Sequence, residues 1–201
     1  VLDMNRSLNA GVFIAAFFLG LAAILWVGAG FVGTSHVALA MTLAIAVVFW
    51  VGALEVRRYR GLTNALASAL ASVPEPLNQV GDWLASVPPP LQHAVRQRIE
   101  GERAALPGLS LTPYLIGLLV MLGMLGTFLG MVVTFKGAVF ALEGSADLAA
   151  IRSALAAPIK GLGFAFGTSV AGVATSAMLG LMSALSRRER LEVVRTLDTR
   201  I

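Results

Sequence analysis

The chain has 201 residues, of which 57% are hydrophobic and only 13% are charged. A soluble domain carries about 25% charged residues, and a domain of this length could not bury so much apolar surface, so a soluble globular protein is excluded. The absence of cysteine excludes disulfides and thiolate metal sites, and we attribute the net charge of +4 to membrane topology rather than to nucleic-acid binding, because the arginines cluster beside apolar segments.

Four apolar segments are each long enough to cross a bilayer, which takes about 17–25 residues. They cover residues 11–31, 37–54, 112–135 and 161–185. The first could be read as a secretory signal, but it is too long for a typical signal core, and an equally apolar segment follows after a short turn. We therefore expect an all-α integral membrane protein with four transmembrane helices, of which the third and fourth are long and extend toward the cytoplasm.

Positive charge predicts the orientation of the chain. The segment after the second apolar run opens with EVRRYR and the C-terminal segment opens with RRERLEVVR, whereas the turn 32–36 carries no Lys, Arg, Asp or Glu. Cytoplasmic loops are enriched in Lys and Arg, so both termini are expected in the cytoplasm. The chain then divides into two transmembrane helices (1–55), a cytoplasmic helical segment with proline-rich breaks (56–110), two further transmembrane helices with an external loop (111–186), and the start of a cytoplasmic C-terminal helix (187–201). We expect that helix to continue in a longer tail beyond Ile201.

The cytoplasmic segment contains a near-repeat, LASVPEPL at 70–77 and LASVPPPL at 84–91. Proline ends a helix at or before the preceding residue. The repeat therefore predicts short amphipathic helices separated by breaks, and a proline-rich docking site is the alternative.

Chemistry-bearing groups are scarce in the apolar segments. His36 and His93 fall on opposite sides of the membrane under this topology, and no Asp, Glu, His, Lys or Arg lies deep in any of the four segments. GLGFAFG (161–167) has one residue too many for a dinucleotide fingerprint and follows no strand. We expect no enzyme activity, no catalytic residue, no metal site and no cofactor. If the chain conducts ions, the carboxylate that carries them must come from another polypeptide.

Glycines and hydroxyl side chains share one face of the third and of the fourth apolar segment, at about 100° per residue. The residues are Gly123, Gly126, Thr127, Gly130, Thr134 and Gly137, and Thr168, Ser169, Gly172, Thr175, Ser176, Gly180 and Ser183. Small-residue stripes usually serve helix packing, with each hydroxyl bonded to a carbonyl one turn back. The length of these stripes and their hydroxyl content also fit a surface that lines an ion pathway.

The segment LGMLGTFLGMVVTF (122–135) resembles the GLLGTVxGxxxxF signature of the MotA/TolQ/ExbB proton-channel family. AFGTSVAGVATS (165–176) is similar, more loosely, to the next span of that family, and the four-span layout resembles the MotA branch. A tail beyond Ile201 would resemble the ZorA-type subunits of anti-phage motors. The resemblance implies a bacterial inner-membrane protein that forms a pentamer around two copies of a B-type single-span partner (MotB-, ExbD-, TolR- or ZorB-like). That partner's intramembrane aspartate would carry H⁺, with Na⁺ as the alternative.

The resemblance also implies roles for individual residues. Contacts to the partner's aspartate along the ion pathway are expected from Thr127, Thr168, Ser169 and Thr134. Pore lining or close packing is expected from Gly123, Gly126, Gly130, Gly172, Thr175 and Ser176. Pro158 would start the fourth helix, where a missing N–H does no harm.

The expected function is therefore that of an A-type subunit of an ion-driven motor. The alternative is a non-conducting membrane scaffold whose small-residue helices only oligomerise. A substrate carrier is disfavoured, because the chain lacks an inverted repeat and a broken helix pair.

Overall fold

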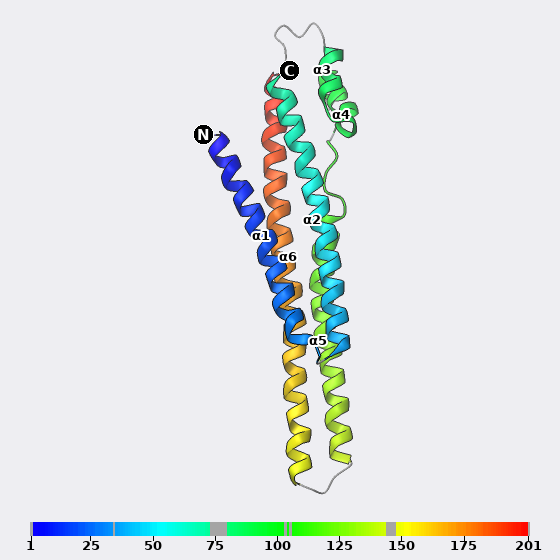
Figure 1. Cartoon of the computed structure of the whole chain (residues 1–201). Helices are drawn as coiled ribbons and strands as arrows, with labels where there is room; N and C mark the ends of the chain where they lie inside the picture. Colours follow the sequence, from blue (N-terminus) through cyan, green and yellow to red (C-terminus); the bar gives the residue numbers. More distant parts are fainter. Residues whose placement is uncertain are drawn as a thin grey trace.

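The computed structural model is a long helical bundle (Figure 1). It describes residues 2–33, 35–72, 80–102, 104, 106–143 and 148–200; of these, only the backbone is described for 2–7, 80, 82, 137, 138, 140–143, 148–161, 164 and 200. The helices are α1 (Leu2–Phe31), α2 (His36–Ala71), α3 (Val80–Ser86), α4 (Pro89–Ile99), α5 (Thr112–Glu143) and α6 (Leu148–Arg200), and the described residues contain no strand.

Four of these helices are long and apolar enough to cross a membrane. The candidate spans are Leu8–Phe31, His36–Ala71, Thr112–Lys136 and Ala165–Thr199. The prediction of an all-α, multi-pass membrane protein with four spans is thereby confirmed. Both ends of the chain lie at the same end of the bundle (Figure 1), as an even number of spans requires.

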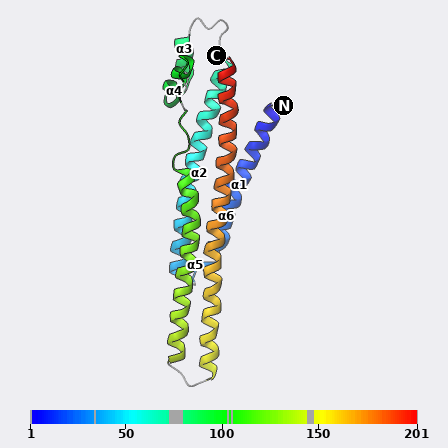
Figure 2. The same cartoon turned by 180° about the vertical axis from the view of Figure 1, so that it is seen from behind.

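The helices that extend beyond the apolar segments are α2 and α6 at one end of the bundle, and α5 and α6 at the other. α6 continues past its apolar segment as expected, but its companion toward the C-terminus is α2 and not α5 (Figures 1 and 2). The segment EVRRYRGLTNALASALA contains no proline, so α2 runs on to Ala71. In contrast, Pro107, Gly108 and Pro113 confine the start of α5 to Thr112. The α5–α6 hairpin instead projects past the α1–α2 turn.

The expectation that Pro158 starts the fourth helix is wrong. α6 begins at Leu148, ten residues earlier, so Pro158 lies inside the helix. The stretch 148–157 contains five alanines, which are the strongest helix formers, and this favours continuation of the helix upstream of the proline. Membrane helices tolerate an internal proline because neighbouring groups can satisfy the freed carbonyl.

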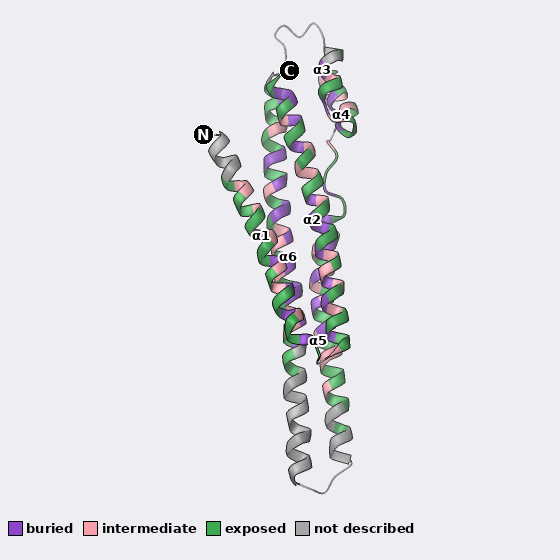
Figure 3. Cartoon of the chain, viewed as in Figure 1, coloured by how far each residue is buried: buried purple, intermediate pink, exposed green. Residues whose placement is uncertain are grey.

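Two apolar clusters hold the helices together. The larger one lies among α1, α2, α5 and α6, where buried residues occupy the faces that meet inside the bundle (Figure 3). The smaller one joins the far ends of α2 and α6 to the short helices α3 and α4, with Leu66, Trp83, Leu91 and Leu197 among its buried members. The Trp83 indole N–H donates to the Ala69 carbonyl oxygen at 2.8 Å. The short helices α3 and α4, which lie in the segment 56–110 that we expect in the cytoplasm, are thus packed against the spanning helices α2 and α6.

The start of α5 is tied to α2 through Glu55. One carboxylate oxygen accepts from the backbone N–H groups of Ser110 and Leu111 at 3.2 and 3.0 Å, and the other accepts from the Thr112 hydroxyl at 2.6 Å. The first N–H groups of a helix have no partner within it, and the helix dipole favours a negative charge there. Glu55 therefore caps α5 from a neighbouring helix.

We expect Glu55→Ala to lower the free energy of unfolding by about 1–2 kcal/mol, because it removes a charged cap and its hydrogen bonds. Denaturant titration of the purified protein in detergent, followed by circular dichroism, measures the loss. Glu100→Ala is the control, since the Glu100 side chain is exposed and pairs with Arg96 at 4.0 Å, and its expected loss is under about 0.5 kcal/mol. Equal losses in the two variants would contradict the capping role.

Candidate functional site at the α5–α6 contact

The helices α5 and α6 approach closely along a row of small residues. A methyl group built on Gly123 would lie 3.2 Å from the Cα of Gly172, and one built on Gly130 would lie 3.2 Å from the Cα of Ala165. Residue numbers rise along α5 as they fall along α6, so the two helices are antiparallel. The backbones themselves are in contact here, which only small residues allow.

The structure places four glycines of the two stripes, Gly123, Gly126, Gly130 and Gly172, in close packing between α5 and α6. Gly126 faces Thr168, and a methyl group built on this glycine would lie 2.5 Å from the Thr168 hydroxyl oxygen. Gly172 faces Leu119, and a methyl group built there would lie 2.6 Å from the Leu119 carbonyl oxygen. A surface for a partner helix must therefore lie beside the glycine row and not on it.

Three of the expected site hydroxyls are buried inside the chain. Thr168 is 1% exposed, Thr175 0% and Ser176 6%. Each donates a hydrogen bond to a carbonyl oxygen three or four residues earlier on α6, at 2.7–3.1 Å. Their surroundings are the packed helices of this chain, so the structure does not bring them to a surface that a partner helix could contact.

The other three expected hydroxyl residues, Thr127, Thr134 and Ser169, are only half-buried. Thr127 donates to the Met124 carbonyl oxygen, and Thr134 donates to that of Met131 at 2.7 Å. A threonine hydroxyl that donates to its own helix still has lone pairs to accept from water, and it can rotate to donate elsewhere. These three residues are therefore the members of the expected ion pathway that keep access to the outside of the bundle.

The register of the hairpin places Thr127 and Ser169 within about 3 Å of each other along the helix axes. Gly126 packs on Thr168, and each of the two half-buried residues directly follows one member of this pair. One step along a helix turns the side chain by about 100°, and in antiparallel helices that step leads to the same side of the contact. Thr127 and Ser169 thus flank the glycine row together, on one side of it.

The outward face of α5 around these hydroxyls is apolar. Its exposed large side chains include Met121, Met124, Phe128, Val133 and Phe135, each of them 56–67% exposed. A contiguous apolar surface of this kind must be covered by lipid or by another helix. Among the described residues there is no group of three His, Cys, Asp or Glu that could hold a metal ion. The site can offer hydroxyl contacts and close approach, but no proton acceptor of its own.

The sequence interpretation missed an ion pair beside the apolar core. Arg60 donates through Nε and one terminal nitrogen to the two carboxylate oxygens of Glu189, at 2.9 and 2.8 Å, and its guanidinium lies 4.8 Å from the centre of the Phe13 ring. The arginines of EVRRYR and RRERLEVVR indicate the orientation of the chain in the membrane, but their clustering alone does not indicate a partner. The single glutamate enclosed by arginines in RRER was the signal that could have indicated a structural pair.

Comparisons of this chain with protein-family models, curated proteins and solved structures find no match. The functional argument therefore depends on the geometry of the α5–α6 contact and on the resemblance of the 122–135 segment.

Proposed function

We propose that this chain is the A-type subunit of an ion-driven motor in the bacterial inner membrane. It would couple ion flow along its interface with a B-type partner to rotation or other mechanical work. The observation that carries the proposal is the pair Thr127 and Ser169, both half-buried and within about 3 Å in depth, in spans whose apolar cores contain no ionisable residue. Hydroxyls can hydrogen-bond a carboxylate but do not titrate near neutral pH, so the proton carrier has to be supplied from outside.

In the proposed mechanism, a single-span partner helix lies along the accessible side of the α5–α6 contact. Its intramembrane aspartate accepts hydrogen bonds from Thr127 and Ser169 while charged, and protonation weakens these bonds and frees the helix to move to the next subunit. Five A-type subunits around two partner helices would repeat the step. One elementary charge crossing 100 mV supplies about 2.3 kcal/mol, which exceeds thermal energy several-fold. H⁺ is the proposed ion, and Na⁺ is the alternative because hydroxyl oxygens can also ligate it.

A non-conducting scaffold is the second candidate, and a specific observation favours it. The buried hydroxyls bond to carbonyls of their own helix, and the glycines pack within the chain, so both stripes have a packing role already. Under this alternative the exposed apolar face of α5 only joins copies of the chain to one another.

The composition of the complex separates the two candidates. The chain would be co-expressed with the product of a neighbouring single-span gene that carries an intramembrane aspartate, and the purified complex would be weighed by native mass spectrometry. A mass of five copies plus two partner chains supports the motor. A closed ring of this chain alone, formed equally well without the partner, supports the scaffold.

We expect Thr127→Val to reduce uncoupler-sensitive proton flux about tenfold in liposomes that contain the complex, because the variant loses a hydrogen bond to a charged group but keeps the side-chain shape. Thr42→Val is the matched control: its hydroxyl is also in a span and donates to the Ala38 carbonyl oxygen at 2.9 Å, but it lies on α2. Loss of assembly in Thr127→Val, with no separate defect in flux, would contradict the motor and favour the scaffold.

A further inference from the structure

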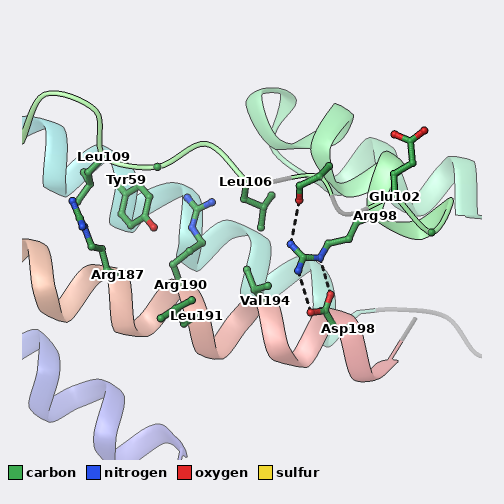
Figure 4. Close-up of a pocket in the computed structure, with 13 residues that line it drawn as sticks. Tyr59, Arg98, Glu102, Leu106, Leu109, Arg187, Arg190, Leu191, Val194 and Asp198 are labelled. Carbon is green, nitrogen blue, oxygen red and sulfur yellow. Dashed lines mark hydrogen bonds and ion pairs between the residues drawn. The ribbon is translucent and has the colours of Figure 1, made fainter.

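A pocket of about 880 Å³ lies beside the C-terminal part of α6, between α2 and residues 98–102 and 106–109 (Figure 4). Its charged lining residues are Arg98, Glu102, Arg187, Arg190 and Asp198, and the rest of its wall is largely aliphatic. The pocket is distinct from the α5–α6 contact, and nothing in the proposed motor uses it.

Arg190 is held in a fixed orientation at this pocket. The residue is 4% exposed, its Nε donates to the Thr63 hydroxyl oxygen at 2.8 Å, and its guanidinium lies 4.3 Å from the centre of the Tyr59 ring. The Thr63 hydroxyl in turn donates to the Tyr59 carbonyl oxygen at 2.9 Å, which fixes its lone pairs toward Arg190. The guanidinium is therefore positioned without the use of its two terminal nitrogens.

Those terminal nitrogens, Nη1 and Nη2 of Arg190, are buried and have no hydrogen-bond partner among the residues that the structure describes. Two nearby carboxylates are engaged elsewhere, since Glu189 pairs with Arg60 at 2.8 Å and Asp198 pairs with Arg98 at 2.7 Å. The third, Glu102, is exposed, and its side chain points away from Arg190 (Figure 4). A buried guanidinium with unused donors is costly, so an acceptor other than the residues that the structure describes would complete the site.

We propose that this pocket binds a phosphate group, held by Nη1 and Nη2 of Arg190 and by the positive charge of Arg187. The planar fork of an arginine matches two oxygens of a phosphate, and Figure 4 shows both side chains projecting from α6 toward the pocket. The volume leaves room for the groups that the phosphate carries.

The depth of the site leaves two sources for the phosphate. Arg187 and Arg190 follow Leu185, the last residue of the apolar segment 161–185, by two and five positions, which is about 3 and 8 Å along the helix axis. That distance corresponds to the headgroup layer of a bilayer. The group can therefore be the headgroup of a phospholipid or a soluble phosphate from the adjacent water, and the same two arginines would recognise either.

The test uses the full chain, purified in a phosphate-free maltoside solution and stripped of lipid. Binding is measured by calorimetry with inorganic phosphate in one arm and with short-chain phosphatidylglycerol in the other, and diacylglycerol of the same chain length serves as the phosphate-free probe. We expect binding in at least one of the first two arms and none with diacylglycerol. Binding of phosphatidylglycerol alone identifies the headgroup, and binding of inorganic phosphate as well identifies a site open to soluble phosphate.

Arg190→Gln should weaken binding at least about tenfold, because it removes a charged bidentate donor. Arg188→Gln is the control. Arg188 lies two residues before Arg190 on α6, its side chain is 71% exposed, and it pairs with Glu192 at 3.5 Å. The phosphate binding of this variant should match that of the wild type. If Arg190→Gln does not fold, Arg187→Gln decides, since Arg187 is exposed and its loss should still weaken binding several-fold. Absence of binding in both arms, or equal weakening by the Arg188 variant, would overturn the proposal. No ion flux enters this test, so its result is independent of the motor.

Discussion

Gly172→Ala should strongly destabilise the protein, because Gly172 lies where the backbones of α5 and α6 are in contact. The new methyl would lie 2.6 Å from the Leu119 carbonyl oxygen and 2.7 Å from the Cα of Gly123. Both neighbours are backbone atoms, so no side chain can rotate away and α5 itself has to move. Overpacking of this kind costs about 1–3 kcal/mol, and the lost contact between the helices adds to the cost.

Gly180→Ala provides the matched comparison for this variant. It adds the same methyl to the same helix and gains the same helix propensity, but its nearest neighbour is the Ile116 Cδ1 atom at 4.0 Å. We expect the free energies of unfolding of the two variants to differ by about 2–3 kcal/mol in a denaturant titration in detergent. If the two variants were equally stable, the antiparallel contact at Gly172 would not be the one that holds the hairpin.

Glu189→Ala should cost about 3–4 kcal/mol of unfolding free energy, because it leaves the Arg60 guanidinium buried without its counter-charge. The two side chains are only 14% and 10% exposed, and they are joined by two parallel hydrogen bonds. Arg60 also stacks on Phe13, so the pair connects α1, α2 and α6 at one point. The variant should therefore loosen three helices at once.

Glu192→Ala is the control for the ion pair, since it lies one turn away on α6 and pairs with Arg188 across an exposed gap of 3.5 Å. Its expected cost is under about 0.5 kcal/mol. The double variant Arg60→Met with Glu189→Leu should recover most of the lost stability, because an apolar pair removes the unpaired charge. Failure of the double variant to recover would show that the stability comes from something other than the pairing of charges.

Much of the architecture was predictable because a bilayer imposes simple rules on a sequence. The four apolar segments, the short turn after Phe31 and the start of the third span at Thr112 follow from length, hydropathy and proline positions. The extent of α2 was not predicted, because the polar stretch after residue 54 carries no stop signal and owes its helical state to packing against α6. The helix start predicted at Pro158 was wrong because the five alanines before it favour a helix that begins earlier, at Leu148.

The sequence predicted which residues share one face of each helix, but not which of those residues are buried and which are accessible. An arc of small residues on each helix groups Gly126 with Thr127 and Thr168 with Ser169, but in the structure only Gly126 and Thr168 are buried at the contact. It does not show how far one helix is rotated against the other, and that rotation decides which hydroxyls are buried. Thr168 and Thr127 differ in this respect although the stripes treat them alike. The Arg190 site required three separate segments to meet, which no local pattern encodes.

The close approach at Gly172 falls near the middle of α6, a single continuous helix of 53 residues. At 1.5 Å per residue, Leu197 lies about 38 Å from that point on one side, and the start of the helix lies about as far on the other. A tilt of about 5° there would carry the Leu197 end by about 3 Å, and the opposite end by a similar distance in the other direction. A tilt of α6 about its contact at Gly172 would therefore move its two ends in opposite directions. Leu197, which packs with Trp83 and Leu91, is the residue through which this movement would reach the short helices α3 and α4.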